Sequence, residues 1–227
     1  MPVAKLEKFD PLSRRDKFGE RREQLAEAAL VTLAELGYAR TSLREIAQNS
    51  EFSHGVLHYY FADKDDLILC GVRQYKAHCV TRYDDVMASA KTSHELLEGF
   101  LAALVQTVRE DGCLHRLWYD IRAQAMFEKA FRSDISEIEK TLENMIWRLV
   151  SRYAELSRSQ ITCEPATIYG AIDGLFQLAL LKHLSGDDQA TDALCDGVRT
   201  VLLGVMKPAS VSKLKRQNIN PPLHTTT

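Results

Sequence analysis

The chain has 227 residues, of which 45% are hydrophobic and 26% are charged, and its formal net charge at pH 7 is −2. This length and composition are typical of a soluble globular protein with a sizeable core. The balanced charge excludes a chain that is basic or acidic as a whole, so charge alone indicates neither a nucleic-acid nor a membrane partner.

Residues 1–13 are expected to form a flexible arm. They lack the apolar segment of a secretory signal peptide. The five cysteines are odd in number and include no CxxC motif, which is typical of free thiols in a reducing compartment. The most apolar run, 172–181, contains Asp173 and Gln177 and is too short to span a bilayer. We therefore expect a cytoplasmic protein with no membrane partner.

The chain after this arm predicts helices almost throughout. Residues 12–164 contain no proline, and apolar residues recur at helical spacing. A first helix ends before Gly37, and a short second helix follows Ser42. The third helix begins after Ser53 as its N-cap, and Asp63 caps a long fourth helix.

Longer helices follow in the second part of the chain. They are predicted from Ser93, from about Leu114 to Phe131, after Ser133, from Pro165, and from about 188 to 206. Residues 207–227 have neither periodicity nor apolar density and are expected to be a disordered tail. The predicted fold class is all-α, with a three-helix domain over 14–62 followed by an antiparallel helical bundle over 63–206 that carries a dimerisation face.

The stretch SEFSHGVLHYYFADK, residues 50 to 64, is unusual for a surface helix. It has a glycine in its first turn and then three consecutive rings, although glycine costs about 0.8–1 kcal/mol relative to alanine in a helix. Two short helices joined by a tight turn form a helix-turn-helix, whose second helix enters the DNA major groove. In that geometry Leu57 and Phe61 pack inward, and the remaining side chains face DNA.

These outward residues carry groups that suit DNA. Hydroxyl and ring N–H groups donate to phosphate oxygens, Val56 can meet a thymine methyl, and Gly55 permits close approach because it has no side chain. Free backbone N–H groups at the starts of the second and fourth helices favour phosphate. The predicted contacts are Thr41, Ser42, Ser53, His54, Gly55, Val56, His58, Tyr59, Tyr60 and Lys64.

The predicted DNA-binding unit is not basic overall. Residues 1–67 hold ten Lys/Arg and twelve Asp/Glu, and seven of the basic residues lie within 1–22. DNA binding would therefore depend on where single basic side chains lie. The candidates are Arg14, Arg15, Arg21, Arg22, Arg44 and Lys64.

Two stretches of the bundle predict a ligand pocket and a dimer interface. Residues 115–127, HRLWYDIRAQAMF, offer the apolar wall with a few polar groups that ligand sites in bundles have; burial in the core is the alternative.

Residues 169–184, YGAIDGLFQLALLKHL, are apolar nearly all round, so they are buried on more than one side. Either an isologous contact with a second copy or burial within one subunit meets that need. The ligand-binding candidates are Trp118, Tyr119, Arg122, Met126 and Phe176. The dimer candidates are Ile168, Gly170, Gly174, Val198, Val201 and Val205.

The segment TSLREIAQNSEFSHGVLHYYFADKDDLI, residues 41 to 68, resembles the DNA-binding domain of the TetR family of bacterial regulators. The shared pattern is a capped short helix, an Ile-Ala pair, a small residue in the recognition helix, an aromatic pair, and then Phe, a two-residue gap and Lys. GVLHYYF, and AIDGL further on, are most similar to the choline-responsive, BetI-like subgroup.

The resemblance implies a dimeric repressor that leaves its operator when a small molecule binds in the C-terminal bundle. It implies that Arg44 contacts a base and that Tyr59 contacts a base or a phosphate. It also implies phosphate contacts from Ser42, Tyr60 and Lys64. His58 stands where the family usually has tyrosine, so any phosphate contact there would depend on pH.

Motifs of catalysis are missing, since the sequence has no GxSxG, P-loop, HExxH or GxGxxG. His54 and His58 have the i, i+4 spacing of metal ligands, but no cysteine or carboxylate is placed to complete a site. We therefore expect no enzymatic activity, no cofactor and no metal. The expected partners are near-palindromic operator DNA, a second copy of the chain and an unknown small-molecule effector. Two alternatives are a helical adaptor that binds a protein through the aromatic helix, and a DNA-binding regulator without an effector.

Overall fold

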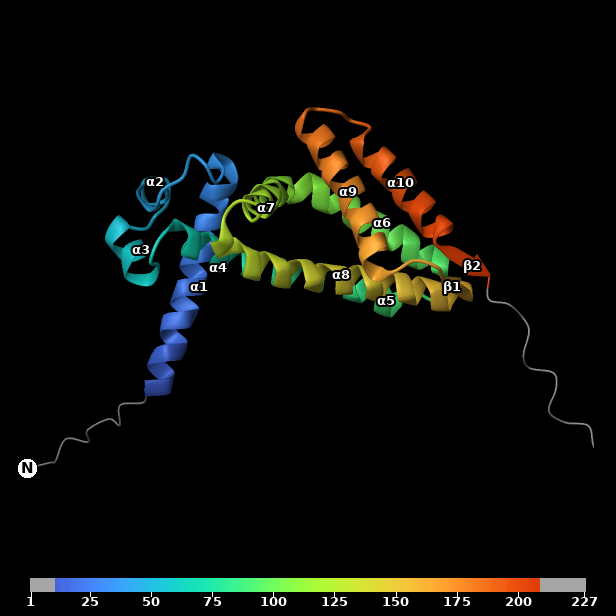
Figure 1. Cartoon of the computed structure of the whole chain (residues 1–227), viewed down its shortest axis with the longest axis horizontal. Helices are drawn as coiled ribbons and strands as arrows, with labels where there is room; N and C mark the ends of the chain where they lie inside the picture. Colours follow the sequence, from blue (N-terminus) through green and yellow to red (C-terminus); the bar gives the residue numbers. More distant parts are fainter. Residues whose placement is uncertain (1–10, 209–227) are drawn as a thin grey trace, which may run out of the picture.

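The computed structural model describes residues 11–208, with side chains from residue 16 onward. Within this range the chain forms ten helices and one two-stranded sheet. Figure 1 shows the first three helices gathered at one end of the molecule and the bundle at the other. The all-α prediction is confirmed.

The N-terminal unit is built on one long helix. α1 packs against α4, and α2 and α3 pack against each other beside α1. The core of this unit contains Leu57 and Phe61, both essentially inaccessible to solvent, as predicted. The bounds are α1 Pro11–Leu36, α2 Leu43–Gln48, α3 His54–Tyr60 and α4 Lys64–Cys79.

Local capping fixes where these helices begin and end. Gly37 adopts φ of +78°, which favours glycine, and its N–H donates to the Leu33 carbonyl at 2.8 Å. At the starts of α2, α3 and α4 an N-cap side chain accepts a hydrogen bond from the backbone N–H three residues on. These caps are Ser42 at 3.2 Å, Ser53 at 3.3 Å and Asp63 at 2.9 Å. All three predicted caps are confirmed.

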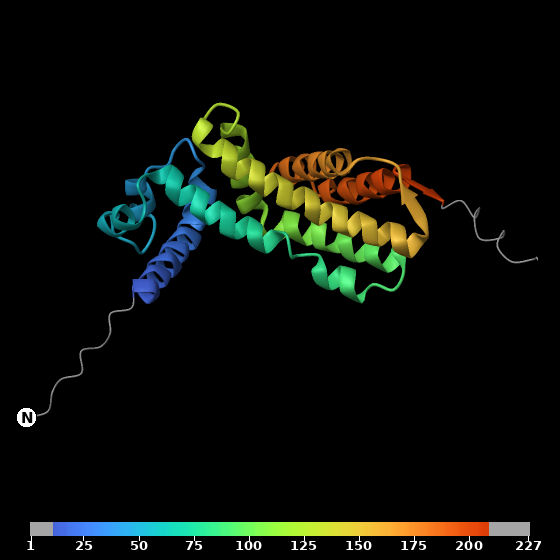
Figure 2. The same ribbon diagram turned by 60° about the horizontal axis from the view of Figure 1, so that its bottom comes forward.

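The bundle continues from α4, which packs against both α1 and α8. Figure 2 shows α4 running from the N-terminal unit into the bundle. The α9–α10 pair packs over α8 and α6. The bounds are α5 Asp84–Ser89, α6 Ser93–Glu110, α7 Gly112–Gln124, α8 Lys129–Ser157, α9 Pro165–Leu184 and α10 Ala190–Gly204. β1 Ser159–Ile161 pairs antiparallel with β2 Met206–Pro208.

The break between α7 and α8 differs from the prediction. A helix was expected to continue to Phe131, but α7 ends at Gln124 and α8 begins at Lys129. Arg132 holds the turn, since its guanidinium donates to the carbonyls of Ala125 and Met126 at 3.0 and 3.1 Å. The side chain thus satisfies carbonyls that a continuous helix would have bonded internally.

The ends of the chain also differ from the prediction, and α5 is not among the predicted helices. Residues 11–13, expected in the arm, belong to α1, while residues 207 and 208, expected in the tail, belong to β2. The rest of the predicted arm and tail lies outside the described residues.

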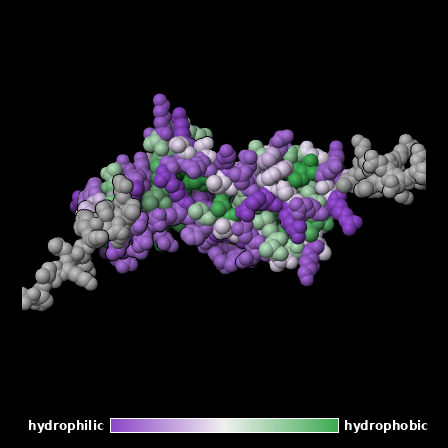
Figure 3. Space-filling view, turned by 90° about the horizontal axis from the view of Figure 1, so that it is seen from below, coloured by the Kyte–Doolittle hydropathy of each residue, from purple (hydrophilic) through white to green (hydrophobic). Residues whose placement is uncertain are grey.

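No helix within residues 11–208 is both long and apolar enough to cross a membrane. The face seen in Figure 3 is mostly hydrophilic, with hydrophobic residues in separate small patches.

Candidate nucleic-acid interface and effector cavity

The α3 helix presents one face to solvent and buries the other. The buried side is anchored by Leu57, while His54, Gly55, Val56 and His58 are exposed and Tyr59 is 68% exposed. A Cβ added to Gly55 would meet no atom within 4 Å. The backbone at Gly55 is therefore open to close approach by another molecule. Ser42 and Arg44, at the start of α2, and Ser53, the cap of α3, are exposed as well.

A residue that the sequence analysis missed supports the two tyrosines. Phe18 on α1 stacks on Tyr60 at 4.7 Å between ring centroids and meets Tyr59 edge-to-face at 5.9 Å. Tyr59 and Tyr60 also contact each other edge-to-face at 5.0 Å. This three-ring cluster restricts the orientations of Tyr59 while leaving it accessible.

The structure contradicts the predicted phosphate contact of Thr41. It also shows that two of the basic candidates, Lys64 and Arg22, already have partners within the chain. Thr41 is buried, its hydroxyl donates to the Gly37 carbonyl at 2.5 Å and its N–H donates to Tyr38, so it has no group free for phosphate. Lys64 donates to the Tyr38 carbonyl at 3.2 Å. Arg22 forms an ion pair with Asp66. The side chains of Arg14 and Arg15 lie outside those described.

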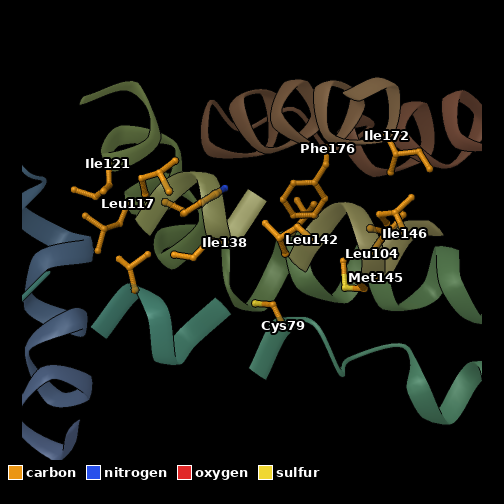
Figure 4. Packing of buried hydrophobic residues seen from close by; sticks show 14 of the residues in the cluster. Cys79, Leu104, Leu117, Ile121, Ile138, Leu142, Met145, Ile146, Ile172 and Phe176 are labelled. Atoms are coloured by element: carbon orange, nitrogen blue, oxygen red, sulfur yellow. The ribbon is translucent and has the colours of Figure 1, made fainter. Parts of the chain in front are cut away.

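A second site lies in the bundle. Side chains from α4, α6, α7, α8 and α9 enclose a cavity of about 70 Å³. Most of its wall is apolar, and Figure 4 shows Phe176 pointing from α9 toward Leu142 on α8. The lining residues used below are Lys76, Arg82, Leu104, His115, Trp118, Tyr119, Leu142, Met145, Ile146, Tyr169, Ile172, Asp173 and Phe176.

Three of the predicted ligand-binding residues lie at this cavity, and their role stays a prediction. Trp118, Tyr119 and Phe176 line the cavity. Arg122 lies behind its wall, where it forms ion pairs with Asp173 and Glu139 at 2.5 and 2.6 Å. Met126 was placed wrongly: it follows the end of α7 and is 70% exposed, because the helix that would have carried it to the cavity stops at Gln124.

Two polar residues that were not predicted lie at the cavity. Lys76 is only 2% exposed, and its Nζ lies 3.4 Å from Nδ1 of the buried His115. Burial lowers the pKa of Lys76 to about 8. Burial, together with the nearby positive charges of Lys76 and Arg82, lowers the pKa of His115 well below its usual value. His115 is therefore neutral and accepts a hydrogen bond from the Lys76 ammonium.

The acidic groups near the cavity already have partners. Asp173 accepts a hydrogen bond from the Tyr119 hydroxyl at 2.9 Å, and Glu139 accepts one from the Tyr169 hydroxyl at 2.8 Å. Burial and these carboxylates raise the pKa of both tyrosines, so both hydroxyls stay protonated. Arg122 neutralises part of the acidic charge.

The predicted dimer residues separate into two groups. Ile168 and Val198 were wrong, because both are buried in the core of one subunit. Val201 and Val205 are partly buried, and Gly170 and Gly174 are exposed with no atom within 4 Å of an added Cβ. The apolar residues exposed on α9 and α10 are Leu178, Leu181, Leu184 and Leu203.

These exposed residues form a continuous feature on α9. A groove of about 340 Å³ is lined by Gly174, Leu178, Leu181 and Leu184, with Arg116 and Tyr119 of α7 at its side. Pairing through α9 stays a prediction. Of its predicted residues Gly174 lines this groove, whereas periodicity could not separate the outer face from the buried one, because α9 is apolar nearly all round.

Metal-ligating groups are not gathered at either site. His54 and His58 lie 4.3 Å apart between ring centroids. Across the part of the chain that the structure describes, no group of three or more His, Cys, Asp or Glu is arranged to hold a metal ion.

Comparisons with known proteins agree with the geometry of α1 to α4. Residues 25–69 match the family described as "Bacterial regulatory proteins, tetR family". The HTH-type transcriptional regulator BetI of Paraburkholderia phymatum is 28% identical over 176 residues, which cover 76% of this chain and 86% of that protein.

Solved structures share the fold over both parts of the chain. A TetR transcription regulator from Haloarcula marismortui has a TM-score of 0.65 at 18% identity and covers 85% of this chain and 100% of its own. The transcriptional regulator FadR from Bacillus subtilis, solved in complex with stearoyl-CoA, has a TM-score of 0.58 at 15% identity and covers 80% and 98%.

The helix-turn-helix geometry, the family match and the BetI relative therefore agree. They set aside the protein-adaptor alternative. Regulators of this family bind operator DNA, act as dimers, bind small-molecule ligands and are not enzymes. This chain is a DNA-binding transcriptional regulator whose residues 25–69 match the TetR family and which is similar to the regulator BetI over 76% of its length.

Proposed function

We propose that the chain is a dimeric repressor of the BetI-like subgroup, which binds a near-palindromic operator through α3 and leaves it when an effector enters the bundle cavity. The observation that carries the proposal is the exposed face of α3, anchored below by Leu57 and supported at its end by Phe18. We place the protein in the cytoplasm, because the operator DNA that it would bind lies there.

On this proposal each exposed group of the helix-turn-helix has a role at the operator. Arg44 and Tyr59 contact bases, and Ser42, Ser53 and Tyr60 contact phosphates. Gly55 lets the N-terminal end of α3 approach a base edge. Lys64 keeps two ammonium protons for phosphate beyond its bond to Tyr38.

Release would act through α4, which belongs to both sites. Its first turn carries Asp66, paired with Arg22 of α1, and its later turns carry Lys76 at the cavity. The cavity of about 70 Å³ is smaller than the roughly 300–1,000 Å³ that drug-sized ligands occupy. An effector must therefore move the helices around it, and a shift of α4 would change the position of α3.

A second connection joins α7 to the C-terminal end of α1 and to the turn that follows it. The Tyr38 N–H donates to Asp120 at 3.0 Å, and Arg116 donates to the Ala34 carbonyl at 2.5 Å. Movement of α7, which supplies Trp118 to the cavity, would therefore also reach α1. FadR from Bacillus subtilis, which shares this fold, was solved in complex with stearoyl-CoA, which supports a ligand-binding role for this chain.

The test begins with selection of bound DNA from a random pool by the purified protein. We expect a near-palindromic site whose affinity falls steeply between about 50 and 200 mM salt. Arg44→Ala and Tyr59→Ala should each weaken binding by about 1–3 kcal/mol in fluorescence anisotropy. Arg152→Ala, on α8, is the matched control and should bind like the parent. Binding that is equally tight in both interface variants would exclude α3 as the recognition helix.

A further inference from the structure

Lys76 is a buried cation without a partner of opposite charge. It follows the apolar positions Leu69 and Val72 on α4 and is almost fully covered. None of the ion pairs among the described residues includes it. A buried ammonium is unfavourable unless something compensates its charge.

Lys76 and His115 have more hydrogen-bond donors than the side chains around them have acceptors. Its ammonium has three N–H donors, and the one polar partner among the described residues is Nδ1 of His115 at 3.4 Å. Because Nδ1 accepts this bond, the proton of the neutral ring lies on Nε2, which is buried and has no partner. The other groups around the ammonium are aromatic rings, with Trp118 at 4.6 Å and Tyr75 at 5.3 Å from Nζ.

The carboxylates of the same region are already paired. The Arg122 guanidinium binds Asp173 and Glu139, and tyrosine hydroxyls donate to both carboxylates. Arg82, the other cation of the cavity wall, is paired with Asp111 at 2.6 Å. The cavity therefore offers unmatched donors and no unmatched carboxylate.

We propose that the cavity binds an organic anion, with its carboxylate on Lys76 and His115 and its apolar body along α8 and α9. Binding of the anion is argued from the cavity alone. Only its role as the effector rests on the proposed function. The apolar body would contact Leu104, Leu142, Met145, Ile146, Ile172 and Phe176. A medium-length alkyl chain suits this wall once the helices move apart to enlarge the cavity.

The same geometry excludes a cationic effector such as choline. A quaternary ammonium binds over an aromatic face, but the Trp118 face already carries the Lys76 ammonium. A second positive charge there would meet repulsion in a site of low dielectric constant. The ligand of this chain therefore differs in charge from the one that resemblance to the choline-responsive subgroup implies.

Three ligands with the same tail test the proposal: octanoate, 1-octanol and octyltrimethylammonium. Their binding to the full chain without DNA is measured by calorimetry at pH 7, for the parent, for Lys76→Met and for Lys140→Met. Lys76→Met removes the charge and keeps most of the side-chain volume, and Lys140 is an exposed lysine of α8. Octanoate should bind the parent roughly ten- to hundredfold more tightly than octanol, the fold-change of one charge-assisted hydrogen bond.

The variants and pH give further expected results. Lys76→Met should lose the preference for octanoate while still binding octanol, and Lys140→Met should behave like the parent. Above about pH 8 the parent should lose octanoate affinity by about tenfold per pH unit, as Lys76 deprotonates. The charged and titratable groups that act on Lys76 are Cys79, Arg82, His115, Glu139 and Asp173.

Several outcomes would overturn the anion proposal. They are tighter binding of octyltrimethylammonium than of octanoate, undiminished octanoate binding by Lys76→Met, equal loss of octanol and octanoate in that variant, and no octanoate binding by the parent. Operator binding is measured separately on the same preparation. Failure to bind DNA with intact octanoate binding would overturn the proposed function alone, and the reverse result would overturn the anion proposal alone.

Discussion

At the residue scale, Lys76 departs furthest from what its residue type predicts. Lysine is rarely fully buried without a partner, and its apolar stem can cross a buried stripe while its charge stays in water. The sequence did carry a signal, since Lys76 continues the helical spacing of Leu69, Val72 and Cys79. Periodicity alone cannot tell a buried ammonium from one that reaches solvent, so the residue was not predicted.

The buried ammonium predicts an unusual dependence of stability on pH. The pKa of Lys76 is about 8 in the folded protein against an ordinary value of 10.5. Between these values the unfolded chain holds a proton that the folded chain has lost, so stability rises with pH. The free energy of unfolding of the parent, relative to Lys76→Met, should rise by up to about 3 kcal/mol from pH 8 to 10.5. Urea unfolding measures it; a difference that stays constant with pH would mean that the ammonium is solvated.

Gly55 is the second residue whose environment makes a prediction. Added atoms would meet nothing in this chain within 4 Å, so Gly55→Leu should keep the fold and stabilise α3 by about 0.5–1 kcal/mol. The same side chain would block close approach to DNA, and operator binding should be lost. Thermal unfolding and anisotropy separate the two effects, with Gly55→Ala as the smaller step. A parallel loss of stability and binding would place Gly55 in the protein's own packing.

At the element scale, features set by near neighbours in sequence were predictable and features set by distant contacts were not. Ser42, Ser53 and Asp63 cap helices through bonds to the backbone three residues away, and the sequence predicts all three. The α7–α8 break depends on Arg132 reaching back to the end of the preceding helix. Phe18 was missed because its contact with Tyr60 joins elements 42 positions apart in the chain.

The contact between α1 and α4 predicts opposite effects for two glycines. A Cβ at Gly71 would lie 2.7 Å from Leu30 Cγ and 2.9 Å from the Ala26 carbonyl oxygen, so α4 lies too close to the α1 backbone for any side chain. Gly71→Ala should destabilise the protein by about 1–3 kcal/mol. Gly19→Ala, on α1 with no atom within 4 Å, should instead stabilise it by up to about 1 kcal/mol. Urea unfolding of both variants decides; a neutral Gly71→Ala would show that the two helices can separate without cost.

At the scale of the whole molecule, the two sites and the proposed dimer face lie on connected elements. α4 links α3 to the cavity, and α9 contributes Phe176 to the cavity and Leu181 to the exposed groove. Leu181 is 64% exposed, and its apolar neighbours on α9 and α10 are exposed with it. Monomers rarely leave such a patch uncovered. Two copies that pair through this face would bury it and hold two recognition helices in fixed register.

Gly174 provides the test of this pairing. It lies in the groove with no atom within 4 Å of an added Cβ, so Gly174→Glu should leave the fold of each subunit intact while placing a charge in the interface. Ser136→Glu, which adds the same charge at an exposed site on α8, is the matched control. We expect Gly174→Glu to sediment as a monomer and to lose more than about tenfold in operator affinity, or 1.4 kcal/mol. Affinity should fall because a dimer binds two half-sites about 34–36 Å apart, or wider, at the same time, whereas a monomer binds only one. If the variant remains a dimer, or if the parent is monomeric at micromolar concentration, the α9–α10 face does not pair subunits. A monomeric parent would also predict an operator without two-fold symmetry, because only a pair of related recognition helices reads both halves of a palindrome.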